Sequence, residues 1–189
     1  RLVMSPIFLT VEYRLPNFPA DPYGLTQAER IEFAPLAMGY LFNNEGIAFL
    51  GEQTFEDGSP LYDERELSHM VDVKVLVQKG LKVFGALGVL ILAYFFWAKN
   101  NGWQYQFFLM VATGGKLLIA FISGLLVFIG INFNQVFTEF HHLFFEGDSW
   151  LFYFSDTLIR LFPMEFWRDA FILVGVLAIG VSGLIIRIV

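Results

Sequence analysis

The chain contains no cysteine, and this absence excludes disulfide bridges, thiolate metal sites and a cysteine nucleophile. Charged residues are also scarce, at 16% of the 189 residues, whereas a soluble domain carries about 25%. The net charge is −6, which argues against nucleic acid as a partner. What the chain has instead is 56% apolar residues, including 23 Phe. A water-soluble protein of this size cannot bury so much apolar surface, so we expect membrane lipid around the chain.

Three apolar segments are long enough for a helix to cross the hydrocarbon of a bilayer, which takes about 20 residues. They lie at residues 81–98, 107–131 and 170–189. Residues 1–13 are too short to cross and contain Pro6, so we expect them to be the outer end of a truncated first helix. The predicted fold class is therefore a mainly α-helical membrane bundle, with three spans visible and a fourth, N-terminal span missing.

The positions of the acidic residues predict which loops share a side of the membrane. All 18 carboxylates lie in the segments 12–72 and 139–169, whereas the loop at 99–106 contains a lysine and no acid. Short cytoplasmic loops favour Lys and Arg. We therefore expect a cytoplasmic loop at 99–106, with residues 14–80 and 132–169 on the extracytoplasmic side.

The segment 14–80 predicts a small extracytoplasmic cap that begins with a helix. Thr26 followed by Glu29 has the spacing of a capping box, and the helix should then run to about Phe42. Pro35 lies inside it and should kink or split it.

The second half of the cap predicts a strand and a turn. Residues 47–55 read as a strand, and Asp57-Gly58 is a hairpin signal directly after it. From about Asp63 a helix should continue without a break into the first full span. The cap is thus predicted to be α+β.

Three histidines, His69, His141 and His142, are the candidates for chemistry, and all lie in the predicted outer segments. At about 1.5 Å per residue, helical extensions put His69 roughly 44 Å and His141 roughly 51 Å from the cytoplasmic ends of their spans. Because the hydrocarbon is about 30 Å thick, both lie at or above one membrane boundary. Such a pair suits general acid–base catalysis, since histidine titrates near working pH. The alternative is that these histidines lie at the membrane interface, with the carbon atoms of the ring against apolar groups and the nitrogens in water, and have no catalytic role.

Neither a metal ion nor a cofactor is expected. His141 and His142 are adjacent and point to different faces of a helix, and no HxxxH pair is present. Lys116 falls inside the second span, where it either snorkels to the interface or marks a later start of the span. The Phe-rich stretch 133–154 suits packing and anchoring, and also a pocket for acyl chains. The candidate pocket residues are Tyr13, Tyr23, Phe140, Phe144, Phe145 and Trp150.

Four segments of the sequence are similar to a known family. They read LPNFPADPYGLT at 15–26, ELSHMVDVK at 66–74, FHHLFFEGDSW at 140–150 and DTLIRLFP at 156–163. In these segments, and in their order, the chain resembles the Lit family of bacterial integral membrane proteins, named for lipoprotein intramolecular transacylase. The likeness covers nearly the whole chain.

The resemblance implies a four-helix membrane bundle in the bacterial inner membrane, with an outer cap that contains strands. It implies an enzyme that moves an acyl chain from the sn-2 oxygen of a lipoprotein's diacylglyceryl group to the amine of its N-terminal cysteine. His69 and His141 would form the catalytic pair, one supplying a base and the other an acid. Asp72, three residues after His69, would orient that ring, and Lys74 would stabilise the tetrahedral oxyanion or else stay solvated.

A different class of function fits the same composition. Glycine-lined helices and phenylalanine faces would also serve a non-catalytic accessory or assembly subunit of a larger photosynthetic or respiratory membrane complex. Other membrane subunits would then be its partners, in place of a lipoprotein substrate. A transporter has little support, because the spans hold one Lys in their interior and no acid.

Overall fold

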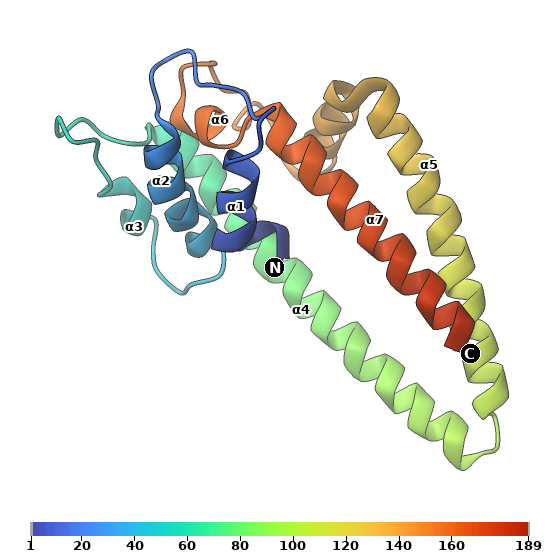
Figure 1. The fold of residues 1–189 in the computed structure, drawn as a ribbon. Coiled ribbons are helices and arrows are strands. Elements are labelled where there is room, and N and C mark those ends of the chain that lie inside the picture. Colours follow the sequence, from blue (N-terminus) through green and yellow to red (C-terminus); the bar gives the residue numbers. More distant parts are fainter. Residues whose placement is uncertain (1, 189) are drawn as a thin grey trace. The chain divides into compact units, whose positions relative to one another are not determined.

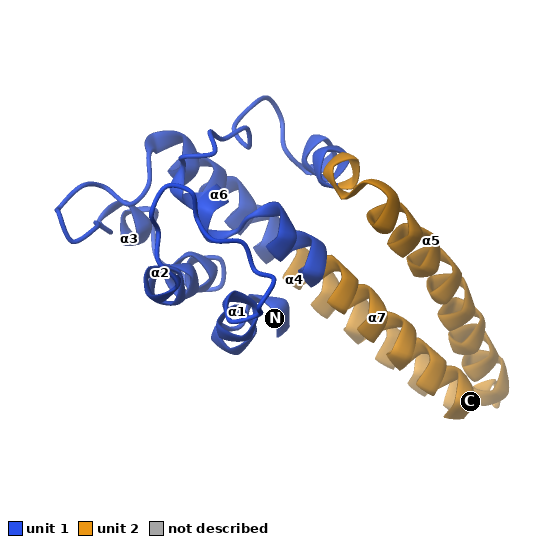
Figure 2. Cartoon of the chain, turned by 45° about the horizontal axis from the view of Figure 1, so that its top comes forward, with its two compact units in different colours: residues 1–79, 137–170 blue, residues 80–136, 171–189 orange. Residues whose placement is uncertain are grey.

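The computed structural model describes residues 2–188, which are mainly helical (Figure 1). The chain divides into two compact units, residues 1–79 with 137–170 and residues 80–136 with 171–189 (Figure 2). The elements in chain order are a 3-10 turn at Leu2–Met4, α1 (Pro6–Tyr13), α2 (Gln27–Tyr40), α3 (Ala48–Gly51), α4 (Glu64–Asn100), α5 (Gln104–Phe144), α6 (Thr157–Leu161) and α7 (Met164–Ile188).

The core of the first unit is built from short helices that are far apart in the sequence. Tyr13 at the end of α1 is fully buried, and its hydroxyl donates a hydrogen bond to the carbonyl oxygen of Leu161 at the end of α6. Its ring lies 6.2 Å from that of Phe166 in α7. The other large side chains that are fully buried in the described part of the chain are Phe166, Leu9, Leu50, Leu61 and Leu161. Burial of these side chains is the main source of stability for this unit, because the helices are too short to be stable alone.

The predicted capping box at the start of α2 is confirmed. The Thr26 hydroxyl accepts from the backbone N–H of Glu29 at 3.2 Å, and the Glu29 carboxylate accepts from the backbone N–H of Thr26 at 2.7 Å. The helix ends at Tyr40 and continues through Pro35 without being split.

The predicted strand at 47–55 is wrong, and so is the α+β cap. Within residues 2–188 the only extended pairing is a single bridge between Thr54 and Pro60. The predicted turn between them is present: Gly58 has φ of +82°, and Ser59 donates its N–H to the Asp57 carboxylate. The apolar run before the turn forms α3, which buries Leu50 completely. A short apolar run fits one helical turn as well as a strand, and tertiary packing decides between them.

Three helices, α4, α5 and α7, are long and apolar enough to cross a membrane, which confirms the three predicted spans. As predicted, α4 starts just after Asp63 and continues into the first span. Within α5, Asn132 breaks the helical backbone with φ of −154° and ψ of 83°. The Asn132 side chain then accepts from the N–H of Gln135 and caps the next helical segment.

Helices of the second unit approach closely at two glycines. A Cβ added to Gly175 in α7 would lie 2.9 Å from Leu126 in α5, and one added to Gly115 would lie 3.2 Å from Ile186. Small residues at such contacts are typical of helices packed in lipid. Most other side chains of the apolar segments are exposed, as expected for surfaces that face lipid.

The prediction for residues 1–13 stays a prediction. The structure shows the 3-10 turn and α1, whose N-cap is Ser5. Arg1 and Val189, which belong to the predicted end segments 1–13 and 170–189, lie outside the described residues.

Candidate active site

The two histidines of the expected pair meet in the first unit. His69 lies on α4, before the apolar segment of that helix, and His141 lies near the end of α5. Their ring centroids are 6.0 Å apart, and the ring planes are inclined by 24°. Both side chains are buried, with 8% and 9% of their surface exposed, whereas His142 is exposed. The structure thus brings together His69 and His141, which we call the histidine pair, and leaves His142 outside it.

Aromatic rings enclose the histidine pair. The buried Phe145 ring lies 5.0 Å from His69 and 5.5 Å from His141. Phe152 contacts His69 at 5.3 Å, and Trp150 contacts His141 at 4.9 Å. The imidazoles therefore lie in an apolar environment of low local dielectric constant.

The hydrogen bonds of the pair favour a base at His141. Its Nδ1 lies 2.7 Å from the carbonyl oxygen of Phe137, one helical turn earlier. Because a carbonyl oxygen only accepts, Nδ1 is the protonated nitrogen, and the Nε2 of a neutral ring keeps its lone pair. The Nδ1 of His69 is buried and has no hydrogen-bond partner within residues 2–188.

Burial favours the neutral form of both imidazoles. Burial lowers the pKa of His69 to about 4, and the neighbouring His141 ring lowers it further in the same direction. Burial also lowers the pKa of His141, although the bond to the Phe137 carbonyl opposes this effect. Both groups lie outside the apolar segments 81–98 and 107–131. The site therefore favours neutral rings, and it disfavours two charged rings side by side.

The two expected supporting residues lie in other surroundings. Asp72 is exposed on α4, and no hydrogen bond joins it to His69 in the part of the chain that the structure describes. The ammonium group of Lys74 donates to the side chain of Asn43 at 2.9 Å and to the carbonyl oxygen of Glu45 at 2.7 Å. It therefore ties α4 to the loop after α2, and these contacts do not direct it at the histidine pair.

The six candidate pocket residues fall into two groups. Phe140, Phe145 and Trp150 lie around His141, and Phe144 contacts the ring of Phe140. Tyr13 belongs to the core described above, and Tyr23 is exposed, 5.9 Å from the guanidinium of Arg160. Within residues 2–188, the ring contacts of Tyr13 are with Phe18 and Phe166, and neither tyrosine is in ring contact with the pair.

Sequence reasoning missed one buried acid beside the pair. Glu66 lies one helical turn before His69 and is only 2% exposed. The signal for it was present, because Asp63 and Glu66 have capping-box spacing, and the Glu66 carboxylate accepts from the Asp63 N–H at 2.8 Å.

Comparison with known proteins settles the family. The family model described as lipoprotein intramolecular transacylase Lit matches residues 2–167. The chain belongs to the Lit family. Its relatives include an uncharacterized protein of Aquifex aeolicus (strain VF5), 31% identical over 182 residues, which cover 94% of this chain and 79% of the relative. The resemblance seen in the sequence is confirmed.

A solved Lit structure shares the fold. The membrane-integral lipoprotein intramolecular transacylase Lit of Bacillus cereus superposes with a TM-score of 0.61 and 22% identity, covering 99% of this chain and 89% of that one. The likeness shows that the two proteins share a fold, and α4, α5 and α7 of this chain are long and apolar enough to cross a membrane.

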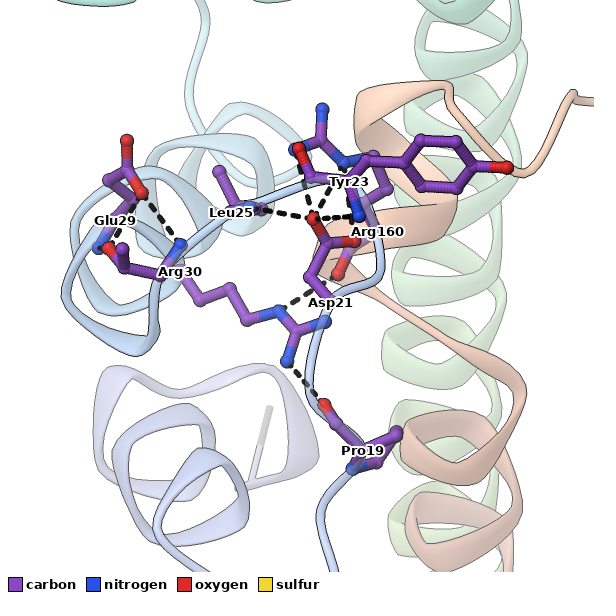
Figure 3. Close-up of polar contacts among 8 residues, drawn as sticks. Pro19, Asp21, Tyr23, Leu25, Glu29, Arg30 and Arg160 are labelled. Carbon is purple, nitrogen blue, oxygen red and sulfur yellow. Dashed lines mark hydrogen bonds and ion pairs between the residues drawn. The ribbon is translucent and has the colours of Figure 1, made fainter.

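Two of the segments that resemble Lit are joined by a buried ion pair (Figure 3). Asp21 and Arg160 are linked at 3.0 Å, with 1% and 12% of their side chains exposed. Arg30 donates to the carbonyl oxygens of Arg160 and Pro19, and the N–H of Leu25 donates to Asp21. This network fixes the loop at 15–26 against α6, and its role is structural.

Proposed function

We propose that this Lit-family protein is a membrane acyltransferase that acts within a diacylglyceryl lipoprotein. It moves the sn-2 acyl chain to the N-terminal amine, and His69 and His141 act as the acid–base pair. The observation that carries the proposal is the buried pair itself, with ring centroids 6.0 Å apart, in a family whose description is lipoprotein intramolecular transacylase.

The chemistry needs no nucleophile from the enzyme, because the substrate amine attacks the ester carbonyl. The substrate ammonium first loses one proton. A second N–H proton is removed as the C–N bond forms, and the sn-2 oxygen takes up a proton as its C–O bond breaks. One proton is released overall. The free Nε2 lone pair of His141 suits it to take the proton from nitrogen and return it to oxygen.

His69 and the surrounding rings support this step in two ways. The ring of His69, with its pKa lowered to about 4, stays neutral beside His141 and leaves the proton to that ring. Phe140 and Phe144, at 4.8 Å from each other, supply an apolar surface beside His141 that suits an acyl chain. With the cap on the extracytoplasmic side, the pair would meet lipoproteins where their modified N-termini lie.

Mass spectrometry of lipoprotein N-termini tests the proposal in a bacterium that lacks this activity. Expression of the protein should convert N-terminal diacylglyceryl-cysteines into N-acylated forms with a free sn-2 hydroxyl. His69→Ala and His141→Ala proteins that still insert into the membrane should each abolish the conversion. Unchanged N-termini with well-expressed wild-type protein would refute the proposed function.

A role as an accessory subunit is the second candidate, and one observation favours it. In the apolar segments, Gly85, Gly88, Gly124 and Gly180 have no atom of another helix within 4 Å of the position of an added Cβ. These open faces would accept helices of another chain. Purification in mild detergent with a stoichiometric set of other membrane proteins, and no N-acylation activity, would support this candidate.

A further inference from the structure

A segment without regular secondary structure covers the histidine pair. We call residues 145–156, between α5 and α6, the aromatic strap. Its Phe145, Trp150 and Phe152 rings make the contacts with the pair given above. Because these three rings depend on an irregular backbone for their position, the attachments of the strap decide how the pair is enclosed.

One attachment lies on the outside of the strap. The Arg65 guanidinium donates to the carbonyl oxygen of Leu151 at 3.3 Å and lies 4.8 Å from the centre of the Tyr153 ring. The Arg65 and Tyr153 side chains are well exposed, so this contact is screened by water and contributes little.

The second attachment is buried and involves Glu66. One oxygen of its carboxylate accepts from the backbone N–H of Leu158 at 2.6 Å, just beyond the end of the strap. The other oxygen accepts from the N–H of Asp63 at 2.8 Å, and the Asp63 carboxylate accepts from the N–H of Glu66 in return. The Glu66 carboxylate lies on α4, one helical turn before His69. It therefore joins this helix to Leu158, which is 92 residues later and just after the strap.

A carboxylate is a costly choice for this position. Burial raises the pKa of Glu66 to about 7, although the N–H groups of Leu158 and Asp63 oppose the effect. An apolar side chain of similar size would fill the same space without this cost. What only the carboxylate provides is two acceptors with fixed directions, each matched to a backbone N–H.

We propose that Glu66 is a positioning residue, whose carboxylate holds the aromatic strap against the rings of His69 and His141. The consequence for catalysis rests on the proposed function, because it assumes that these rings act on the substrate. The geometric part of the proposal stands apart from it.

Carbethoxylation of histidine by diethyl pyrocarbonate measures the geometry directly. The chain has three histidines and no cysteine to compete, and peptide mass analysis reports each histidine separately. In the intact protein in lipid nanodiscs, the exposed His142 should react fast, and the buried His69 and His141 slowly. In Glu66→Ala, the rates at His69 and His141 should rise about tenfold, because loss of bonds to a charged acceptor loosens the strap. The His142 rate should stay the same.

Two further variants make the test sharp. Glu66→Gln keeps one acceptor oxygen, and we expect a rise of about threefold at His69 and His141. Glu64→Gln is the matched control, because Glu64 lies in the same first turn of α4, is exposed, and takes no part in these bonds; it should react as wild type. Wild-type rates at His69 and His141 in folded Glu66→Gln would overturn the proposal, even if Glu66→Ala fails to fold.

The enzymatic readout separates this proposal from the proposed function. With N-acylation activity present, Glu66→Ala should lower kcat about tenfold and change KM little, because the rings are displaced while the acyl-chain surface of Phe140 and Phe144 is kept. Increased labelling in Glu66→Ala, together with a wild-type protein that transfers no acyl chain, would support the strap and refute the acyltransferase. An unchanged labelling pattern in Glu66→Ala, together with active wild-type protein, would refute the role of Glu66 and support the acyltransferase.

Discussion

Replacement of His141 by Asn tests the roles of its two ring nitrogens separately. The Asn side-chain amide can donate from a position close to that of Nδ1, and can thus keep the hydrogen bond to the Phe137 carbonyl. It has no atom at the position of Nε2. His141→Asn should therefore remove the base and leave the local structure in place.

The expected loss of rate follows from the role of the base. General base catalysis contributes about 10²–10⁴ in rate, which corresponds to about 3–5 kcal/mol of transition-state stabilisation. We expect kcat to fall by this factor. The free energy of unfolding should change by no more than about 1 kcal/mol, because one hydrogen bond of this kind is kept.

The assay follows N-acylation of a synthetic diacylglyceryl lipopeptide by purified protein in proteoliposomes. The reaction is an isomerisation without a change in mass, so loss of the primary amine and the N-terminal fragment ions report it. His142→Asn is the control: that side chain is exposed, and its ring contact is with Trp150. It should retain activity within about threefold. A His141→Asn protein with wild-type kcat, or a His142→Asn protein without activity, would refute the assignment of the base.

Three other predictions concern topology, stability and pH. Cysteines introduced into the cysteine-free chain at Glu52 and Asn101 should react with an impermeant maleimide from outside and from inside the cell, respectively; reaction of Asn101→Cys from outside would reverse the orientation. Asp21→Asn should destabilise the first unit by about 1–3 kcal/mol, seen as a lower Tm, because it removes the charge that pairs with the largely buried guanidinium of Arg160. Burial raises the pKa of Glu66 to about 7 from 4.5, so the folded state binds a proton more tightly than the unfolded state, and acidification from pH 7 to 5 stabilises through this group. The buried histidine pair, with lowered pKa values, has the opposite effect. Glu66→Gln should therefore lose Tm on acidification more steeply than wild type, and parallel Tm curves would contradict these shifts.

Local chemistry predicted the helices well. The capping box of Thr26 and Glu29 predicted the start of α2, and the apolar segments predicted the three long helices. Both signals act within a few residues or along one helix, and they can be read directly from the sequence. The strand predicted at 47–55 was wrong because it depended on local sequence alone. Burial of Leu50 against residues distant in the sequence stabilises a helical turn there instead.

The site was predictable only in part. The positions of the histidines along their helices, together with the family resemblance, indicated that His69 and His141 meet. The bond between Glu66 and Leu158 spans 92 residues and depends on the path of the aromatic strap, for which the sequence has no periodic signal. Asp72 shows the limit of spacing arguments: it lies three residues from His69, yet it is exposed while the ring is buried.

The most direct test of the acyltransferase uses one purified protein and one labelled substrate. A synthetic lipopeptide with a ¹³C-labelled sn-2 acyl chain is incubated with the wild-type protein in proteoliposomes, and the fragment ions that contain the N-terminal amine are analysed. The account predicts the label on the amine nitrogen with wild-type protein, and label retained on the glyceryl group with His69→Ala or His141→Ala. Label that stays on the glyceryl group with folded wild-type protein would contradict it.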